Sequence, residues 1–300
     1  MDRAVQTVEH ALDLAAGKPV YVRKEIVHNL HVVRNLSSRG AVFVESELSV
    51  PEGETVVLSA HGSAPVVYEN SASRRLNVID ATCPLVTKVH HEVKRYVADG
   101  YRLVLIGHEG HEEVVGTMGE APEAITLVGS VEEVADLPEL ASGEKLAYVT
   151  QTTLSVDETR VIIAALVDRF PEIHRPAKED ICYATSNRQR AVKELAREAQ
   201  LVLVIGSRNS SNSCRLVEVA RDHGAASHLI EDASGIDEAW IGHVDTVGIT
   251  SGASAPEHLV QGVIDWFAAR DVTEVQVLEV VGEDVVFKLP RPIRQALAAR

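Results

Sequence analysis

The chain has 300 residues, of which 45% are apolar and only 4% are aromatic, so a sizeable core has to be built from aliphatic side chains. Its 29 basic and 44 acidic residues give a net charge of −15, which argues against proteins that bind nucleic acid or an anionic membrane through a basic surface. No apolar run approaches a membrane span, the stretch MDRAVQTVEHALDLAAG has no signal-peptide pattern, and three cysteines are too few for a disulfide framework, so we expect a cytoplasmic, reduced protein.

Short apolar runs alternate with helical patterns along the chain. Nearly continuous apolarity is typical of strands covered on both faces, and the alternation predicts α/β units with mostly parallel sheets. Strands are expected at residues 20–26, 41–45, 55–60, 76–81, 102–107, 124–129, 145–150, 201–206, 226–231 and 246–250. Helices are expected at residues 3–15, 29–38, 64–75, 84–98, 155–169, 187–198, 211–222 and 256–269. The stretch 270–300 breaks this rhythm and is expected to form a tail with one hairpin-like strand pair around Gly282.

Two shifts in composition predict domain boundaries. The segment DATCP follows a strand pattern near residue 81, and PEIHRPAKEDI at 171–181 is polar and contains prolines, as linkers do. We therefore expect three small α/β domains at residues 1–81, 82–178 and 179–269, followed by a tail at 270–300.

Nearly every predicted strand ends in a loop of small polar residues with His, Cys or Gly. In open α/β sheets, ligands bind outside the carboxyl ends of the strands, so one face of each domain is expected to carry the reactive groups. If the three domains turn these faces inward, they enclose one central site. The loops are residues 59–62, 80–84, 107–113, 150–153, 180–183, 206–212 and 250–254.

The loop from Gly206 to Asn212 has the features of an anion site. It follows the most apolar strand and precedes a helix, and it carries Ser210, Ser211 and Asn212. Hydroxyl, amide and backbone N–H donors at a helix N-terminus suit a phosphate or diphosphate. The alternative is an ordinary helix cap, which uses one such residue. The loop ending at Ser254 repeats the pattern before the last predicted helix.

Three histidines, His28, His61 and His111, follow strands or precede helices without belonging to an apolar pattern. We interpret them as imidazoles that face the anion, although a loop histidine is often only a surface residue. The His108–His111 spacing is i, i+3 in a glycine-flanked loop, which differs from the helical i, i+4 pair of zinc proteases. Glu112 and Glu113 are either a solvated pair in a helix's first turn or, in a cavity, a source of protons.

Cys83 and Cys182 are each expected to end a strand and open a helix. A thiolate is favoured at a helix N-terminus, and thiolates hold iron clusters, although a small buried residue is the simpler interpretation for either one alone. Cys214 lies inside a predicted helix and is interpreted as core filler. A metal-dependent hydrolase that uses the histidine-rich loops leaves these two cysteines unexplained.

Eight segments of the chain, in order, resemble the 4-hydroxy-3-methylbut-2-enyl diphosphate reductase family of isoprenoid biosynthesis, the methylerythritol phosphate route. They are EIVHN (25–29), SAHG (59–62), DATCPLVTKVH (80–90), GHEGHEEVVGTMG (107–119), TQTTLSVDET (150–159), DICYATSNRQ (180–189), GSRNSSNS (206–213) and TSGASAP (250–256). The resemblance implies a trefoil of three α/β domains around a central cavity. It also implies a four-iron four-sulfur cluster that is held by three cysteines.

The resemblance also assigns roles to residues of this chain. It implies that Cys83 and Cys182 ligate the cluster, that Glu113 donates a proton and that Thr152 lies near the substrate hydroxyl. Ferredoxin or flavodoxin is the implied electron donor. The implied diphosphate ligands are His28, His61, His111, Ser210, Ser211, Asn212 and Ser254.

The chain departs from the family pattern at its start. The family carries its first cluster cysteine in a strand and loop ending Gly-Phe-Cys-Ala-Gly-Val, just before Asp-Arg-Ala, whereas this chain begins Met1-Asp2-Arg3-Ala4. We expect an N-terminal truncation from a start site assigned too late, the alternatives being a deliberately shortened chain or a truncated paralogue. Two of the three expected cluster cysteines are then present, and a cluster-deficient form would only bind the diphosphate.

Overall fold

The computed structural model describes residues 1–272, 274–282 and 285–299. The chain forms two compact units. The first comprises residues 1–27 and 33–182 together with the stretch from Phe287 to the end of the described chain, and the second comprises residues 28–32 and 183–286. Helix α2 (Leu30–Ser38) begins in the second unit and continues in the first.

The first unit contains two parallel sheets, with strand orders β2-β1-β3-β4 and β6-β5-β7. The strands are β1 (Val20–Arg23), β2 (Ala41–Val44), β3 (Thr55–Leu58), β4 (Asn77–Asp80), β5 (Tyr101–Ile106), β6 (Ile125–Val128) and β7 (Lys145–Thr150). The helices are α1 (Asp2–Ala15), α3 (Pro65–Ser73), α4 (Pro84–Ala98), α5 (Glu112–Met118), α6 (Val131–Ala135), α7 (Val156–Arg169) and α11 (Arg291–Ala298), with a short turn of 3-10 helix, η1 (Glu47–Ser49).

Helices cover both faces of the β6-β5-β7 sheet. On one face, Val93 and Tyr96 of α4 and Val114 of α5 pack against Leu103 and Leu105. On the other face, α6 and α7 pack against the intervening side chains of the same strands. Burial on both faces explains why these strands read as nearly continuous apolar runs.

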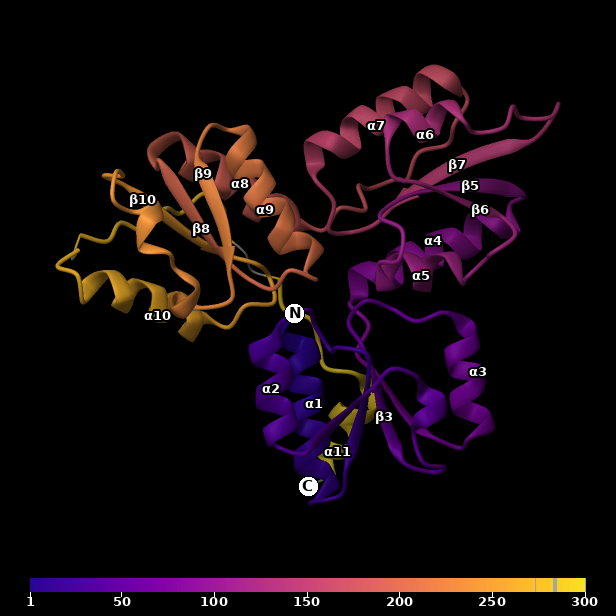
Figure 1. The fold of residues 1–300 in the computed structure, drawn as a ribbon. Helices are drawn as coiled ribbons and strands as arrows, with labels where there is room; N and C mark the ends of the chain where they lie inside the picture. Colours follow the sequence, from indigo (N-terminus) through magenta and orange to yellow (C-terminus); the bar gives the residue numbers. More distant parts are fainter. Residues whose placement is uncertain (273, 283–284, 300) are drawn as a thin grey trace. The chain divides into compact units, whose positions relative to one another are not determined.

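The last helix belongs to the first unit although it comes from the far end of the sequence. Figure 1 shows α11, in yellow, beside α1, in indigo. Ile293 of α11 is buried, and the Nε–H of Arg3 donates to the Lys288 carbonyl at 2.7 Å. The carboxyl end of the chain thus supports the helix that opens it.

The second unit is built on one parallel sheet with the order β10-β8-β9. Val192 of α8 and Leu216 of α9 pack on one face, and Val263 of α10 packs on the other. The elements are α8 (Tyr183–Glu198), β8 (Leu201–Ile205), α9 (Ser211–Asp222), β9 (Ala226–Ile230), η2 (Ala233–Gly235), η3 (Glu238–Trp240), β10 (Val247–Ser251) and α10 (Glu257–Ala268).

The predicted α/β class with small parallel sheets is confirmed, and all ten predicted strands and eight predicted helices are present. The exact domain boundaries stay a prediction, although the three sheets fall one in each predicted range. The expected hairpin around Gly282 is wrong for residues 274–282 and 285–290, which contain no strand, and its remaining positions lie outside the described residues. Helix α11 follows instead, because Pro290 and Pro292 suit a helix start.

Candidate functional site

Glu113 is a buried acid of the first unit whose carboxylate accepts two hydrogen bonds. It lies in the first turn of α5, after β5, and is 2% exposed. Its Oε1 accepts the backbone N–H of Thr152 at 2.6 Å, and its Oε2 accepts the Thr152 hydroxyl at 3.0 Å. Thr152 follows β7, the strand that pairs with β5, so the parallel register brings the two predicted catalytic residues together.

The surroundings of Glu113 raise the pKa of its carboxyl, so the carboxyl stays protonated up to nearly neutral pH. Burial raises the pKa of this carboxyl to about 7, against the opposing hydrogen bonds from Thr152. His61 also lowers the pKa, whereas the negative charge of Asp180 raises it. A carboxyl that titrates near neutrality is suited to give a proton to a bound molecule.

His61 and His111 face each other beside this acid. Their ring centroids are 6.0 Å apart in a T-shaped arrangement, and His61 Nδ1 lies 3.3 Å from Glu112 Oε2. His111 is the N-cap of α5, where its Nδ1 accepts the backbone N–H of Glu113 at 3.1 Å. The neutral His111 ring therefore carries its proton on Nε2.

The two acids lie in a short helix rather than in the loop we expected. Helix α5 begins at Glu112, so both glutamates occupy its first turn, as the simpler interpretation proposed. Glu113 is buried and bonded to Thr152, whereas the Glu112 side chain is 26% exposed and brings its Oε2 to 3.3 Å from His61 Nδ1. The helix therefore assigns different environments to adjacent acids.

Cys83 is placed as predicted, but the strand expected before Cys182 is absent from the described residues. Cys83 follows β4 and is the N-cap of α4. Cys182 directly precedes α8, and residues 175–181 before it form no strand. The segment is positioned by side-chain and backbone bonds instead, since the Cys182 N–H donates to the Thr152 carbonyl at 3.0 Å. Both thiols are partly exposed.

Cys214 has a different setting. It lies inside α9, and its Sγ donates to the Arg208 carbonyl at 3.2 Å. Burial and the nearby Glu218 carboxylate raise the pKa of this thiol, so the thiolate form is disfavoured. Cys214 is only partly buried, so it does not fill the core as expected, and its purely structural role stays a prediction.

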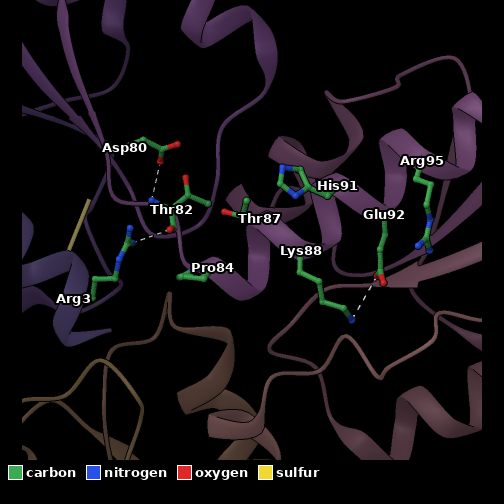
Figure 2. A pocket seen from close by; sticks show the side chains of 9 residues that line it. All are labelled: Arg3, Asp80, Thr82, Pro84, Thr87, Lys88, His91, Glu92 and Arg95. Carbon is green, nitrogen blue, oxygen red and sulfur yellow. Dashed lines mark hydrogen bonds and ion pairs between the residues drawn. The ribbon is translucent and has the colours of Figure 1, made fainter. Parts of the chain in front are cut away.

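A pocket of about 620 Å³ lies at the start of α4 and is lined mostly by charged and polar residues (Figure 2). Thr82 and Pro84 line it on either side of Cys83 in sequence, and charged side chains of α4 form much of the remaining wall. Arg3 closes one end by donating to the Thr82 carbonyl at 2.9 Å. The first unit therefore has an open pocket that includes both sequence neighbours of Cys83.

The second unit contains a candidate anion site at the start of α9. Ser210 is the N-cap, and its Oγ accepts the backbone N–H of Ser213 at 3.3 Å, which confirms the capping alternative for this one residue. Asn212 is 3% exposed, and neither polar atom of its side chain has a hydrogen-bond partner in the described part of the chain. A buried carboxamide without partners is costly unless a ligand satisfies it.

Ser254 and His28 lie at the same unit's strand ends. The Ser254 hydroxyl donates to the His28 carbonyl at 3.0 Å, and the Leu30 N–H donates to Ser207 Oγ at 3.2 Å. A Cβ on Gly252 would lie 3.5 Å from Asn212 Nδ2 and 2.1 Å from Ser213 Oγ, so the loop of Ser254 packs directly on the start of α9. Ser211 begins α9 and is partly buried.

Two residues near the site were not singled out from the sequence. Gln151 is 1% exposed, and its Oε1 accepts the His108 N–H at 3.1 Å, which ties the loop after β5 to the loop after β7. Asp180 accepts the Thr150 N–H at 2.9 Å and the Lys88 ammonium at 2.8 Å. Both stood inside predicted polar loops, but their role depends on contacts across strands, which spacing along the chain does not reveal.

Three small parallel sheets, with carboxyl, imidazole, hydroxyl and amide groups at their strand ends, define an α/β protein of the kind that carries out chemistry on a small molecule. Residues 1–268 match the family described as LytB protein, and the chain belongs to this family. No helix in the described ranges has the length and apolarity that crossing a membrane requires.

Relatives with curated names cover almost the whole chain. A protein of Acidothermus cellulolyticus named 4-hydroxy-3-methylbut-2-enyl diphosphate reductase is 57% identical over 301 residues, which cover 100% of this chain and 88% of the relative. The protein of Corynebacterium diphtheriae with the same name is 54% identical over 99% of this chain and 89% of its own length.

Solved structures are similar as well. The E-1-hydroxy-2-methyl-but-2-enyl-4-diphosphate reductase of Plasmodium falciparum has a TM-score of 0.96 and 36% identity, over 99% of this chain and 94% of that one. An (E)-4-hydroxy-3-methyl-but-2-enyl diphosphate reductase, described as the terminal enzyme of the non-mevalonate pathway, has a TM-score of 0.64 and 32% identity, over 89% and 94% of the two chains.

The raised pKa of Glu113 predicts a pH-dependent loss of stability. Between the ordinary value of 4.5 and about 7, the folded state keeps a proton that the unfolded chain releases, so Glu113 destabilises the fold increasingly as pH rises through this window. Glu113→Gln should therefore unfold like wild type near the ordinary pKa and be more stable by about 3 kcal/mol above neutrality.

Urea unfolding across this pH range measures the difference. Glu109→Gln is the matched control for removing a carboxylate, because Glu109 is exposed in the same loop. A constant stability difference between Glu113→Gln and wild type at all pH values would mean that the carboxyl does not titrate in this range.

Proposed function

We propose that the chain is a 4-hydroxy-3-methylbut-2-enyl diphosphate reductase of isoprenoid biosynthesis. The reaction breaks the C–O bond of the substrate's allylic alcohol: two electrons and two protons enter, the oxygen leaves as water, and isopentenyl or dimethylallyl diphosphate results. Family membership and the relatives' names support the substrate. The observation that carries the proposal is the buried Glu113 carboxyl, which titrates near neutrality and is bonded to Thr152.

The Glu113–Thr152 pair is suited to pass a proton toward the substrate oxygen. Glu113 Oε1 accepts a backbone N–H and so remains an acceptor in either protonation state, which places the exchangeable proton on Oε2. When Oε2 is protonated, it donates to Thr152 Oγ1, and the threonine hydroxyl is then able to donate to the substrate. When Glu113 is ionised, the same hydroxyl donates back to the carboxylate.

Donors for the diphosphate are available in both units. His61 and His111 in the first unit, and Asn212 in the second, present imidazole and amide N–H groups at strand ends. The family resemblance adds His28, Ser210, Ser211 and Ser254 to the second unit's donors. Hydrogen bonds from these groups to charged oxygens supply the binding free energy.

The cysteines fit the family's cluster in part. Cys83 and Cys182 are partly exposed thiols at helix starts, as cluster ligands require, whereas the raised pKa of Cys214 and its bond to the Arg208 carbonyl make it a poor third ligand. A bound four-iron four-sulfur cluster would pass the two electrons on from an external reductant, one at a time. Residues 1–300 provide two of the three thiols that we assign to it.

A low-potential one-electron carrier, ferredoxin or flavodoxin, is the proposed electron donor. Such carriers and an oxygen-sensitive cluster belong to a reducing compartment, so we infer a cytoplasmic location.

Glu113→Gln should reduce turnover by roughly 100-fold, the usual scale for a lost acid–base group, while diphosphate affinity stays within about twofold of wild type. The carboxamide keeps an acceptor for the Thr152 N–H but has no proton to give. Turnover with an artificial reductant, measured on cluster-loaded protein, tests this. Turnover close to that of wild type would remove Glu113 from the proton-donor role.

Asn212→Ala should raise the Kd for inorganic diphosphate at least about tenfold, because a hydrogen bond to a charged group is worth about 1.5–3 kcal/mol. The ligand-free variant should be as stable as wild type or more so, since neither polar atom of Asn212 has a partner to lose. Ser210→Ala is the contrast: it also removes the α9 cap and should destabilise the fold by about 1 kcal/mol. Calorimetric titration and urea unfolding measure both, and unchanged affinity in both variants would leave the loop as a cap only.

Cys83→Ser and Cys182→Ser should each lower the iron and acid-labile sulfide that the protein binds on anaerobic reconstitution, because each removes a thiol that we assign to the cluster. Cys214→Ser should leave both contents unchanged, since this thiol lies inside α9 and bonds the Arg208 carbonyl. Loss of the cluster in Cys214→Ser would reverse the assignment of Cys214.

A further inference from the structure

A second polar cluster lies behind the turn that carries His61. His90 of α4 has a side chain that is 8% exposed, and its Nδ1 lies 2.8 Å from Glu120 Oε1. The other oxygen of Glu120 is 2.9 Å from the ammonium of Lys94, and the Glu120 side chain is only 5% exposed. Lys94 lies one helical turn after His90, so α4 holds Glu120 through two side chains.

The edge of the His90 ring supports Gly62. Gly62 has φ +86, and a Cβ there would lie 3.0 Å from Cε1 and Nε2 of His90 and 3.0 Å from Cγ1 of Val86. Any other residue at this position would both strain the backbone and press on the imidazole. The Gly62 backbone therefore rests on the imidazole, immediately after His61.

Helix α5 closes the opposite side of the same turn. A Cβ on Gly116 would lie 3.2 Å from the carbonyl carbon and oxygen of Gly62. One turn further on, a Cβ on Gly119 would lie 2.3 Å from the Cβ of Ala64. The two glycines let α5 approach the turn closely, and Glu120 follows directly after them.

The protonation state of His90 fits a fixed orientation. Burial lowers the pKa of His90 despite the Glu120 carboxylate, so the ring is neutral at neutral pH. Its single proton then lies on Nδ1 and is donated to Glu120. Nε2 is buried without a hydrogen-bond partner in the described ranges, so the ring edge at the glycine is a packing surface rather than a second polar link.

We propose that His90, whose ring is oriented by Glu120 and indirectly by Lys94, is a positioning residue. It fixes the position of the His61 side chain relative to His111 and Glu112. It acts through Gly62, the neighbour of His61, and it touches none of the reacting groups. This inference rests on the proposed function, because it assigns His90 an effect on diphosphate binding.

The test variant removes the edge of the His90 ring but keeps a hydrogen bond to Glu120. In His90→Asn, the amide nitrogen takes the place of Nδ1, whereas the atoms corresponding to Cε1 and Nε2 are gone. The Kd for inorganic diphosphate should rise about tenfold, in line with the effect of a small displacement of a binding group. The KM for the substrate should rise with it, while kcat, which depends on Glu113, should change much less.

His91→Asn is the matched control, since His91 is exposed one position further along α4 and faces the pocket in Figure 2. It should leave the Kd unchanged. The imidazole ¹H–¹³C signal of His61, assigned by its loss in His61→Asn, should move in His90→Asn and stay in place in His91→Asn. A role in stability alone would not move this signal in protein that remains folded.

A double-mutant cycle tests the route through the glycine. Gly62→Ala should weaken binding in wild type but weaken it less in the His90→Asn background, where the added methyl no longer meets the imidazole, so the two effects should not add. Should His90→Asn not fold, Glu120→Gln replaces it, because it keeps the volume and removes the charge that orients the ring.

The possible outcomes distinguish a failure of the His90 positioning role from a failure of the proposed function. Unchanged Kd and an unchanged His61 signal in His90→Asn, or in Glu120→Gln where that variant replaces it, would overturn the positioning role, as would additive effects in the cycle. If wild type itself does not bind diphosphate but the His61 signal still moves in His90→Asn, the positioning role stands and the proposed function fails.

Discussion

The strand pairings described in the three sheets are all parallel, and this constraint determines where the candidate functional side chains lie. Parallel strands send the loops that follow them to the same edge of a sheet. His61 follows β3 and Cys83 follows β4, while the loops after β5 and β7 bring Glu113 to Thr152. The register of the sheets, rather than the conformation of any single loop, therefore sets which side chains meet.

The same arrangement leaves two polar side chains near the strand ends in unfavourable surroundings. Glu113 is buried where its charge is poorly solvated, and Asn212 is buried with neither polar atom bonded in the described ranges. Each group lowers the stability of the ligand-free fold. A bound anion that accepts from Asn212 would relieve the cost at that residue, so part of the binding free energy would come from the fold itself.

The fold was largely predictable from the sequence because its strands are buried on both faces. Runs such as LVLVI in β8 contain only branched aliphatic residues, and no helical period competes with them. Short or polar elements were harder to predict. Helix α5 follows two glycines in GHEGHEE, and the first turn of α8, with Ala184, Thr185 and Ser186, has no apolar period.

The candidate site was predictable only where it lies in continuous segments. The loops around Glu113, Thr152 and Asn212 stand out as polar stretches after apolar strands. The strand expected before Cys182 was wrong because a single isoleucine is not a strand pattern, and the Thr152 carbonyl positions that cysteine instead. The bond from His90 to Glu120 joins residues thirty positions apart, and no spacing rule relates them.

The pKa of Glu113 illustrates how the sheet and the acid are coupled. Ile106 and Thr150 are paired at the ends of β5 and β7, so the loops that carry Glu113 and Thr152 start side by side. Asp180 accepts the Thr150 N–H and adds negative charge behind the acid, which raises its pKa, while the two bonds from Thr152 lower it. Burial outweighs these bonds and brings the pKa to about 7. Because each of these contacts depends on the same strand register, a slip of one residue between β5 and β7 would remove the tuning and the proton path together.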